Sequence, residues 1–376
     1  MHGTKAILIH GAACLSLALP LSALAANGVV GPANCNEAGF ASVLAAVEGS
    51  GGGTITFACG TATIGFTSPK QIAHAVVIDG GGTITLDGGG ASALFQIYAS
   101  ANVTLQRLTM QHGVFNGGHA LENFGTLVLR RVTLRNNTST AAPVLNQNNL
   151  IVEWSTFADN LTSGTGSNGR GGAILNDGGT VAIRYSTFSG NTAASGGGAI
   201  YSNGPITVTN ATFSGNRTTA AGSGGGAIQV DSADAGSVVH ATIVDNVGQT
   251  FGGGIYSASG ALRVSRSIIA NNTNGNCDGV LDSGGYNLWF GTTSCAFAAS
   301  GDGAGNPLLG ALAGNGGPTG TRLPGSGSAA INRIPSAQCI APVDQRGGGR
   351  PAGNGCDSGA VEAGAVIDLI FEDGFQ

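Results

Sequence analysis

Short stretches of alternating apolar and polar residues recur along the middle of the chain, each preceded by a glycine pair and closed by an asparagine. The clearest copy is GGAIYSNGPITVTNATFSGN over residues 197–216, and similar copies begin at Gly171, Gly225 and Gly252. Weaker copies occupy residues 117–137 and 142–160, and the closing asparagines follow one another at intervals of 23 to 31 residues. A repeat of that length with loops of variable size is typical of a solenoid.

The alternation also indicates the kind of solenoid. In Ile206-Thr207-Val208-Thr209 the apolar residues stand at every second position, which is the period of a half-buried strand. Each copy holds three such short segments, and none has the length or the 3.6-residue period of a helix. We therefore predict an all-β fold, a parallel β-helix with three strands per turn. The winding should be right-handed, as parallel crossovers are.

Aligning the copies predicts columns of stacked side chains. One inward column is aliphatic: Ile174, Ile200, Ile228 and Ile255. A second is Leu134, Phe157, Phe188, Phe213, Ile243 and Ile269. The closing asparagines should stack at a bend and bond along the axis, as asparagine ladders do in stacked strands: Asn137, Asn160, Asn191, Asn216, Asn246 and Asn272.

The ends of the chain differ from these repeats. Residues 1–25, with Lys5 before an apolar run and Ala23-Leu24-Ala25 after it, predict a cleaved secretory signal peptide. Residues 26–365 then form one β-helix domain. Within it we expect an N-terminal cap and first strand (34–60), coils (61–275) and an irregular C-terminal cap region (276–365), before a tail (366–376). The cap should contain a short helix that begins after Asn36, a good N-cap, and covers the first turn.

Composition narrows the possible partners. Charged residues make up 9% of the chain, against about 25% in average proteins. The net charge is −5 and no basic cluster is present, so nucleic-acid binding is not expected. No segment after the signal is apolar enough to span a membrane.

Cysteine usage fits an oxidising compartment. Apart from Cys14 in the leader, six cysteines form three local groups. Sequential pairing is favoured because a solenoid keeps sequence neighbours close, although six cysteines allow 15 connectivities and free thiols remain an alternative. The expected pairs are Cys35–Cys59, Cys277–Cys295 and Cys339–Cys356.

Several motifs resemble known families. VIDGGGTITLDG (residues 77–88) looks like the early coils of pectin-lyase-like right-handed β-helix proteins. The GGAI and FSGN motifs resemble the repeats of chlamydial polymorphic outer-membrane proteins, which are adhesins. From Asn276 onward, NCDG, GGYNLW, PLLGALAGNGGPTGT, GSAAIN and DQRGGGRPAGNGCDSGAVE are similar to the end of the bacterial choice-of-anchor Q domain. That resemblance implies an exported bacterial β-helix, of a family whose members carry assorted C-terminal sorting tails, and leaves the biochemical role open. The final IDLIFEDGFQ resembles a short tail seen on exported proteins of some gammaproteobacteria.

Enzymes on this fold act on acidic polysaccharides and need carboxylates on neighbouring turns. Glu153 stands between two arginines of its column, which is more typical of a surface ion-pair ladder. Asp159 has its nearest aligned aspartate three turns away. His119 and Glu122 share one turn without a second carboxylate beside them, and His119 is interpreted as a solvent-facing loop residue. These four residues are weak catalytic candidates. No metal or other cofactor is expected, except calcium if the protein were a lyase.

Two further outward columns suggest binding instead. A row of threonines from Thr109 to Thr242 could order water on an ice-binding face, although strand propensity explains a single row more simply. A bend column sets aromatics between arginines and polar groups: Arg107, Arg131, Trp154, Tyr185, Asn210, His240 and Arg266. Four of these residues are candidates for glycan binding: Trp154, Tyr185, Arg131 and His240. The alternative is that their side chains only fill the bend.

We therefore predict a secreted or cell-surface bacterial protein with a non-catalytic role in adhesion or glycan contact. The runner-up is a polysaccharide lyase or glycoside hydrolase. The sequence names no ligand, anchor or oligomeric state.

Overall fold

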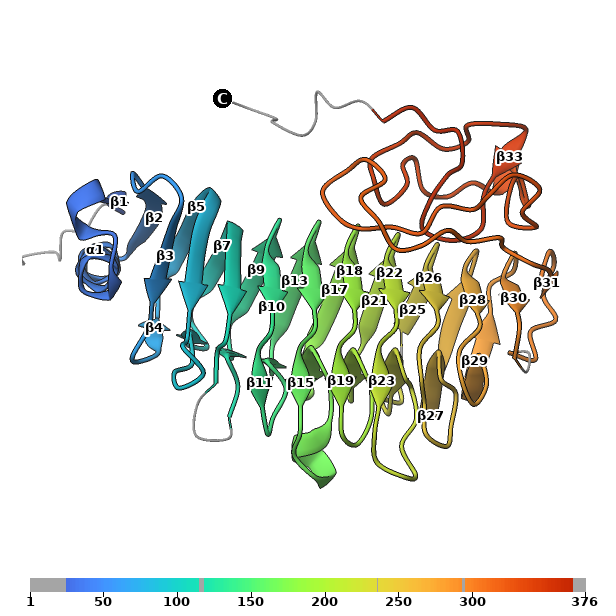
Figure 1. The fold of residues 1–376 in the computed structure, drawn as a ribbon, viewed down its shortest axis with the longest axis horizontal. Helices are drawn as coiled ribbons and strands as arrows, with labels where there is room; N and C mark the ends of the chain where they lie inside the picture. The colour runs from blue at the N-terminus through green and yellow to red at the C-terminus, as the bar shows by residue number, and fades with distance from the viewer. Residues whose placement is uncertain (1–24, 115–117, 235, 293–294, 368–376) are drawn as a thin grey trace, which may run out of the picture.

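The computed structural model describes residues 25–114, 118–234, 236–292 and 295–367. All but the last residue of the predicted signal peptide lies outside these ranges, as do residues 368–376 of the predicted tail. The described chain forms a right-handed parallel β-solenoid of about ten turns with one short helix, as the repeats predict. Figure 1 shows the turns stacked along the long axis, with the helix at the N-terminal end.

Each turn carries three strand positions, and each strand pairs in parallel with its copies in the turns before and after. The first position is occupied by β4 (Lys70–Ile72), β6 (Phe95–Ile97), β8 (Leu121–Asn123), β12 (Val144–Asn146), β16 (Ile174–Asn176), β20 (Ile200–Ser202) and β24 (Ile228–Val230). The second is occupied by β2 (Gly52–Phe57), β9 (Thr126–Arg130), β13 (Asn149–Glu153), β17 (Thr180–Arg184), β21 (Ile206–Thr209) and β25 (Gly236–Val239).

The third position faces the upper side in Figure 1. It is occupied by β3 (Ala62–Gly65), β10 (Thr133–Arg135), β14 (Thr156–Ala158), β18 (Thr187–Ser189), β22 (Thr212–Ser214), β26 (Thr242–Val244), β28 (Ile268–Ala270), β30 (Leu288–Phe290) and β31 (Gly303–Ala304). Long strands join two positions: second and third in β5 (Ala75–Asp87) and β7 (Asn102–Gln111), first and second in β27 (Ile255–Ser265) and β29 (Cys277–Ser283). A fourth, two-residue ladder was not predicted: β11 (Thr138–Ser139), β15 (Leu161–Thr162), β19 (Thr192–Ala193) and β23 (Arg217–Thr218).

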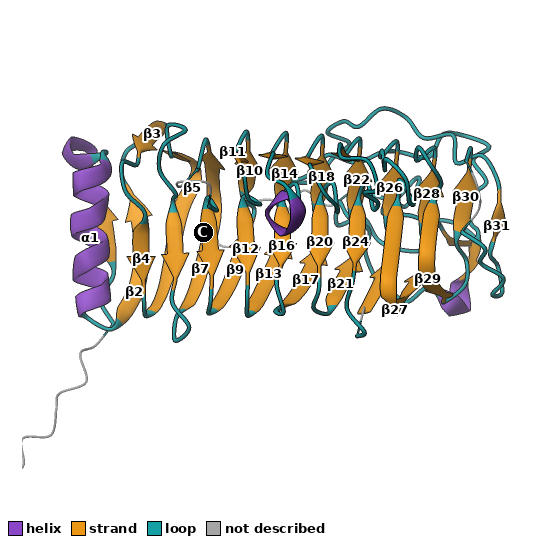
Figure 2. Ribbon diagram, turned by 90° about the horizontal axis from the view of Figure 1, so that it is seen from below, coloured by secondary structure: helices purple, strands orange, loops and turns teal. Residues whose placement is uncertain are grey.

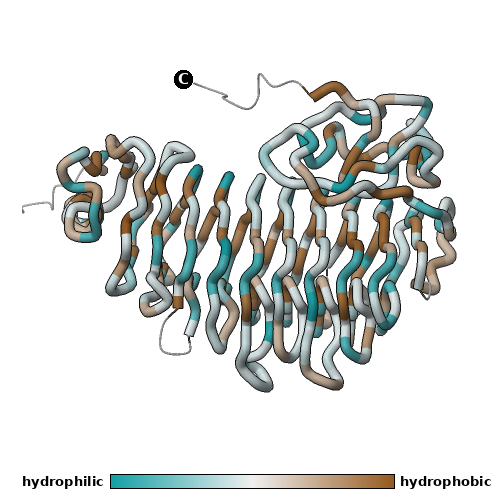
Figure 3. The backbone as a smooth tube through the Cα atoms, viewed as in Figure 1, coloured by the Kyte–Doolittle hydropathy of each residue, from teal (hydrophilic) through white to brown (hydrophobic). Residues whose placement is uncertain are grey.

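The predicted inward columns are confirmed. Ile174, Ile200, Ile228 and Ile255 are partners in successive turns and are fully buried. In the second column, the ring of Phe188 lies 4.6 Å from that of Phe157 and 4.9 Å from that of Phe213, with planes 6° apart. In Figure 3 the hydrophobic segments recur at corresponding heights of successive turns. Burial of these stacks supplies most of the stability, at roughly 25 cal/mol per Å² of apolar surface.

The asparagine ladder is also confirmed. The side-chain amide of Asn160 donates to the side-chain oxygen of Asn191 at 2.8 Å, and the same bond links each neighbouring pair. The ladder continues one step further, to Asn276. A second buried ladder at the end of the first strand position was not predicted: Asn123, Asn146, Asn176 and Ser202.

The N-terminal cap contains the predicted helix, α1 (Glu37–Gly49). Asn36 is its N-cap and accepts from the amide of Gly39. Phe40, Leu44 and Val47 are buried against the first turn. The strand β1 (Gly28–Val30) and the 3-10 turn η1 (Pro32–Asn34) precede the helix and were not predicted; β1 pairs with β2 and extends the sheet by one strand.

All three predicted disulfides are present: Cys35–Cys59, Cys277–Cys295 and Cys339–Cys356. The first joins the residue before Asn36 to the chain just after β2, so it ties the cap to the first turn. We expect the Cys35→Ser/Cys59→Ser variant to show faster amide hydrogen exchange in α1 and β2 than in the middle turns, because each turn of a solenoid contacts only its neighbours.

The matched control is the Cys277→Ser/Cys295→Ser variant, which should increase exchange in the last turns and leave α1 unchanged. Equal exchange along the chain after loss of the first disulfide would contradict a local role for it.

The C-terminal region carries two of the three disulfides, as predicted, and consists of two parts. Residues 277–304 complete the last turns as β29, β30 and β31. Residues 305–365, here called the C-terminal segment, instead fold back along the side of the solenoid over β18, β22, β26 and β28 (Figure 1). Its regular elements are short: β32 (Ile334–Pro335), η3 (Ser336–Gln338) and β33 (Gly355–Cys356). Without a strand period, the sequence alone does not reveal this docking.

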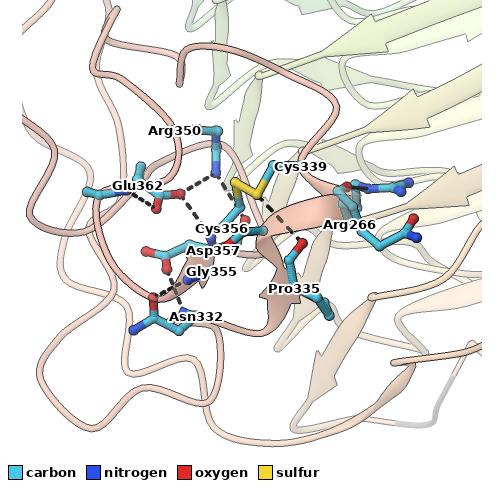
Figure 4. Close-up of a disulfide and its surroundings, with 12 residues drawn as sticks. Arg266, Asn332, Pro335, Cys339, Arg350, Gly355, Cys356, Asp357 and Glu362 are labelled. Atoms are coloured by element: carbon cyan, nitrogen blue, oxygen red, sulfur yellow. Dashed lines mark hydrogen bonds and ion pairs between the residues drawn. A yellow bond between two sulfur atoms is a disulfide. The ribbon is translucent and has the colours of Figure 1, made fainter.

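The C-terminal segment is held together by buried ion pairs from the DQRGGGRPAGNGCDSGAVE motif. Arg350 pairs with Glu362 at 2.9 Å, with both side chains at most 1% exposed, and Arg346 pairs with Asp344 at 2.7 Å. Glu362 also accepts from the amides of Ala352 and Asp357. Figure 4 shows Arg350, Asp357 and Glu362 of this network beside the Cys339–Cys356 disulfide. The motif therefore builds the interior of a small polar subdomain.

Candidate functional site

The bend column is a row of residues with a left-handed backbone. All seven residues of the column have φ between 44° and 54°: Arg107, Arg131, Trp154, Tyr185, Asn210, His240 and Arg266. This region is unfavourable for bulky residues other than glycine. The column lies at the bend between the second and third strand positions. The residue directly after each member of the column is buried. Two of these residues are Ser155 and Ser186, whose hydroxyl oxygens accept from backbone amides of the preceding turn.

Trp154 and Tyr185 form an aromatic stack in this column. Their ring centroids are 4.9 Å apart and their planes differ by 13°. Because turns are also ~4.8 Å apart, the rings stack along the solenoid axis and each uses one face against the other. A sugar ring therefore cannot stack on the two ring faces that pack against each other. The other face of Trp154 is turned toward Arg131 of the preceding turn, and Trp154 as a whole is half-buried.

The C-terminal segment covers the bend column from Tyr185 onward. Thr319 donates to the carbonyl oxygen of Tyr185 at 3.0 Å, and Asn210 donates to that of Val343 at 3.0 Å. The expectation that His240 lies on an exposed edge is wrong, since its side chain is 0% exposed beneath the segment. Burial, then the charges of Arg350 and Arg266, lower the pKa of His240 well below its ordinary value. His240 is thus a neutral interior residue.

The threonine row is divided at the same place. It is longer than predicted, because Thr63 and Thr85 precede Thr109 in register. In the covered half, Thr187, Thr212 and Thr242 are at most 1% exposed, which corrects the interpretation of a continuous outward row. In the open half, five threonines are exposed or half-buried: Thr63, Thr85, Thr109, Thr133 and Thr156.

We call the surface around these five threonines the open lateral face. Arg107, Arg131 and Trp154 border it on the bend side. On the other side Gln111 donates to Asp87 at 2.7 Å and accepts from Arg135 at 3.2 Å. In Figure 1 the turns that carry this face, among them those of β3 and β10, lie toward the N-terminal end, before the loops of the C-terminal segment begin. The face is polar and open, with an aromatic residue at the end where the segment starts.

The catalytic candidates Glu153 and Asp159 lie apart. Glu153 pairs with Arg130 at 2.9 Å on the outer surface next to the bend, in the predicted ion-pair column. Asp159 is exposed at the turn after β14, with a left-handed backbone. The two carboxylates are thus on opposite sides of the third strand position.

His119 and Glu122 lie on another side of the solenoid. The ring of His119 is half-buried, not solvent-facing, and its Nδ1 donates to the carbonyl oxygen of Ala142 at 2.6 Å. Burial lowers the pKa of His119, so the ring is neutral at pH 7. Glu122 accepts from Gln96 at 2.9 Å. His119 and Glu122 therefore form hydrogen bonds to different neighbours.

Near His119 is a groove of about 280 Å³ that sequence analysis missed. It lies between the first strand position and η2 (Gly166–Gly169), which crosses over β16 in Figure 2. The guanidinium of Arg170 lies 4.4 Å from the ring centre of Tyr201, whose hydroxyl donates to Asp231 at 2.5 Å. Asp177 accepts from Asn203 at 2.8 Å. Asp177 and Asp231 stand two residues after Leu175 and Gln229, which align with Glu122 in the sheet, so a search for carboxylates aligned with Glu122 passes over them.

In the part of the chain that the structure describes, no three His, Cys, Asp or Glu side chains are grouped so that they could hold a metal ion. The described residues also include no helix that is long and apolar enough to cross a membrane.

Comparison with known proteins agrees with the fold. Residues 116–298 match the family model described as right handed beta helix region. The matched range covers the coils from β8 to β30, including Trp154, Tyr185 and the groove at Tyr201. Neither the curated proteins nor the solved structures contain a match to the chain. The fold is thus that of the right-handed β-helix, a scaffold compatible with glycan contact.

Proposed function

We propose that the protein is an exported, surface-associated or secreted β-helix that binds polysaccharide without cleaving it, through the Trp154 end of the open lateral face. The observation that carries the proposal is the position of Trp154 and Tyr185. Their left-handed bends hold an aromatic pair at the edge of the solenoid, with Trp154 next to Arg131 and Tyr185 where the C-terminal segment begins to cover the column. Aromatic rings with polar tips suit the contact of a wet surface with a sugar.

Export is supported by three disulfides, which persist in oxidising compartments. The resemblance of the C-terminal motifs to the choice-of-anchor Q domain agrees with a bacterial cell-surface location.

We expect the Trp154→Ala/Tyr185→Ala variant to lose glycan binding on an array while keeping its fold. Both residues must be replaced, because removal of Trp154 alone exposes the ring face of Tyr185. The matched control is the Phe251→Ala/Tyr256→Ala variant, since that pair also stacks, at 5.1 Å and 15°, on another part of the solenoid. Loss of binding in the control, or full binding in the Trp154 variant, would contradict the proposal.

A second candidate, glycoside hydrolysis, is favoured by the groove at Tyr201. Asp177 and Asp231 face outward two turns apart, roughly 9–10 Å at the strand spacing, which is close to the carboxyl separation of inverting glycosidases. Asp177 lines the groove, and Asp231 accepts from the hydroxyl of Tyr201 in its wall. Polysaccharide cleavage that persists in the aromatic variant and is lost in Asp177→Asn or Asp231→Asn would establish this function instead.

A further inference from the structure

The covered half of the threonine row shows what these hydroxyls bind. Thr187 donates to the carbonyl oxygen of Gly320 at 2.5 Å and accepts from the side-chain amide of Gln345 at 2.8 Å. Thr212 donates to Gln345 at 2.7 Å, and Thr242 accepts from the amide of Ala360 at 3.0 Å. A hydroxyl can donate and accept at once. Every partner here is an uncharged group of a chain laid against the side of the solenoid.

The open half continues the same row. Thr156 is the strand partner of Thr187, and Thr133 of Thr156, so the spacing of hydroxyls is unchanged across the boundary. Within the described residues the hydroxyls of the five open threonines have no partner in the protein, whereas all three covered ones do. The five span four intervals of ~4.8 Å, or about 19 Å. The open lateral face therefore continues the row of hydroxyls that bonds the C-terminal segment.

Charge on this face is balanced. Four arginines and four carboxylates lie on it or beside its bend edge: Arg107, Arg130, Arg131 and Arg135, with Asp79, Asp87, Glu153 and Asp159. Arg107 pairs with Asp79 and Arg130 with Glu153. The sum of +4 and −4 is zero, so the face offers no net attraction to an anionic polymer such as a polyuronide.

We propose that the open lateral face is a docking ladder for a neutral polysaccharide, whose chain lies along the solenoid axis. The threonine hydroxyls bond successive sugar hydroxyls, as the covered threonines bond the C-terminal segment, and Trp154 contacts the sugar at the boundary. This inference rests on the proposed glycan binding. It adds the chemical class of the ligand, the orientation of the polysaccharide along the solenoid axis, and the threonines that bind successive sugars. The binding surface is continuous with an interface that the chain already makes with itself.

The test is the Thr85→Val/Thr109→Val/Thr133→Val variant, which removes three hydroxyls and keeps residues that suit strands. The control is Thr104→Val/Thr126→Val/Thr207→Val, three outward threonines of the second strand position. Folding of both is checked by circular dichroism and thermal melting. The probes are β-1,4-linked glucose oligosaccharides from disaccharide to hexasaccharide, and galacturonic acid oligosaccharides of the same lengths, measured by calorimetry at low and high salt.

We expect the glucose series to bind more tightly as its length grows, with little dependence on salt. The ladder variant should weaken hexasaccharide binding by about tenfold or more, since each lost hydrogen bond contributes modestly, and the control variant should bind like the parent protein. Binding restricted to the galacturonic acid series would overturn the assignment to a neutral ligand.

Unchanged affinity in the ladder variant, with binding lost in the Trp154→Ala/Tyr185→Ala variant, would refute the ladder and leave glycan binding at the aromatic pair. A dimer of the parent protein that the ladder variant abolishes would show that the face binds a second copy of the chain. Absence of binding to both series and to a glycan array would refute the proposed function itself.

Discussion

The Glu362→Ala variant should release the C-terminal segment from the side of the solenoid. Removal of this carboxylate leaves Arg350, which is fully buried, without its counter-charge, and it also leaves the amides of Ala352 and Asp357 without their acceptor. Breaking a buried ion pair from one side costs about 3–5 kcal/mol. Hydrogen exchange should therefore accelerate by on the order of a hundredfold or more at Ala360 and in β18 and β22.

The control is Asp282→Ala, which breaks the pair with Arg263. Those two side chains are 60% and 50% exposed, and an exposed pair contributes about 1 kcal/mol or less. Equal exchange in both variants would show that the buried pair does not hold the segment. If the ladder of threonines binds sugar, the Glu362→Ala protein should in addition bind longer oligosaccharides than the parent, because Thr187, Thr212 and Thr242 become accessible.

The Phe188→Ala variant should lose about 3–5 kcal/mol of unfolding free energy. Phe188 is 0% exposed and stacks on both sides, on Phe157 and on Phe213. The rings above and below are fixed in their own turns, so the cavity cannot close without breaking strand pairs. Urea titration followed by circular dichroism measures the loss.

Tyr98→Ala serves as the control, since Tyr98 is 38% exposed and its removal should cost about 1 kcal/mol or less. A loss of that size for Phe188→Ala as well would mean that the phenylalanine column contributes little to the core.

The repeating part of the fold could be predicted because each position of the repeat occurs in several copies that can be aligned. The stack of Phe157, Phe188 and Phe213 and the asparagine ladder follow from the alignment of copies alone. Register was less clear near the N-terminus, where the GGAI and FSGN motifs are absent. For that reason Thr63 and Thr85 were not recognised as the start of the threonine row.

The candidate site depended on information that no repeat carries. The C-terminal segment has no strand period, and its bonds to Thr187 and Asn210 join residues 133 apart in the sequence. Sequence therefore could not show that His240 is buried while Trp154 stays open. The alignment predicted that Trp154 and Tyr185 are neighbours, but not that their faces pack on each other. That arrangement depends on side-chain angles at a left-handed bend.

The asparagine ladder also has a consequence for how such a protein can change over generations. Each ladder asparagine bonds the turn next to it, so one turn is interchangeable with another as a building block. Duplication or deletion of the gene segment for one turn before Tyr185 would add or remove one threonine of the open face. The docking of the C-terminal segment would be untouched, because the hydrogen bonds that its described residues make to the solenoid begin at Tyr185 and lie further along. Recombination between repeats would thus lengthen or shorten the open lateral face in single steps of ~4.8 Å.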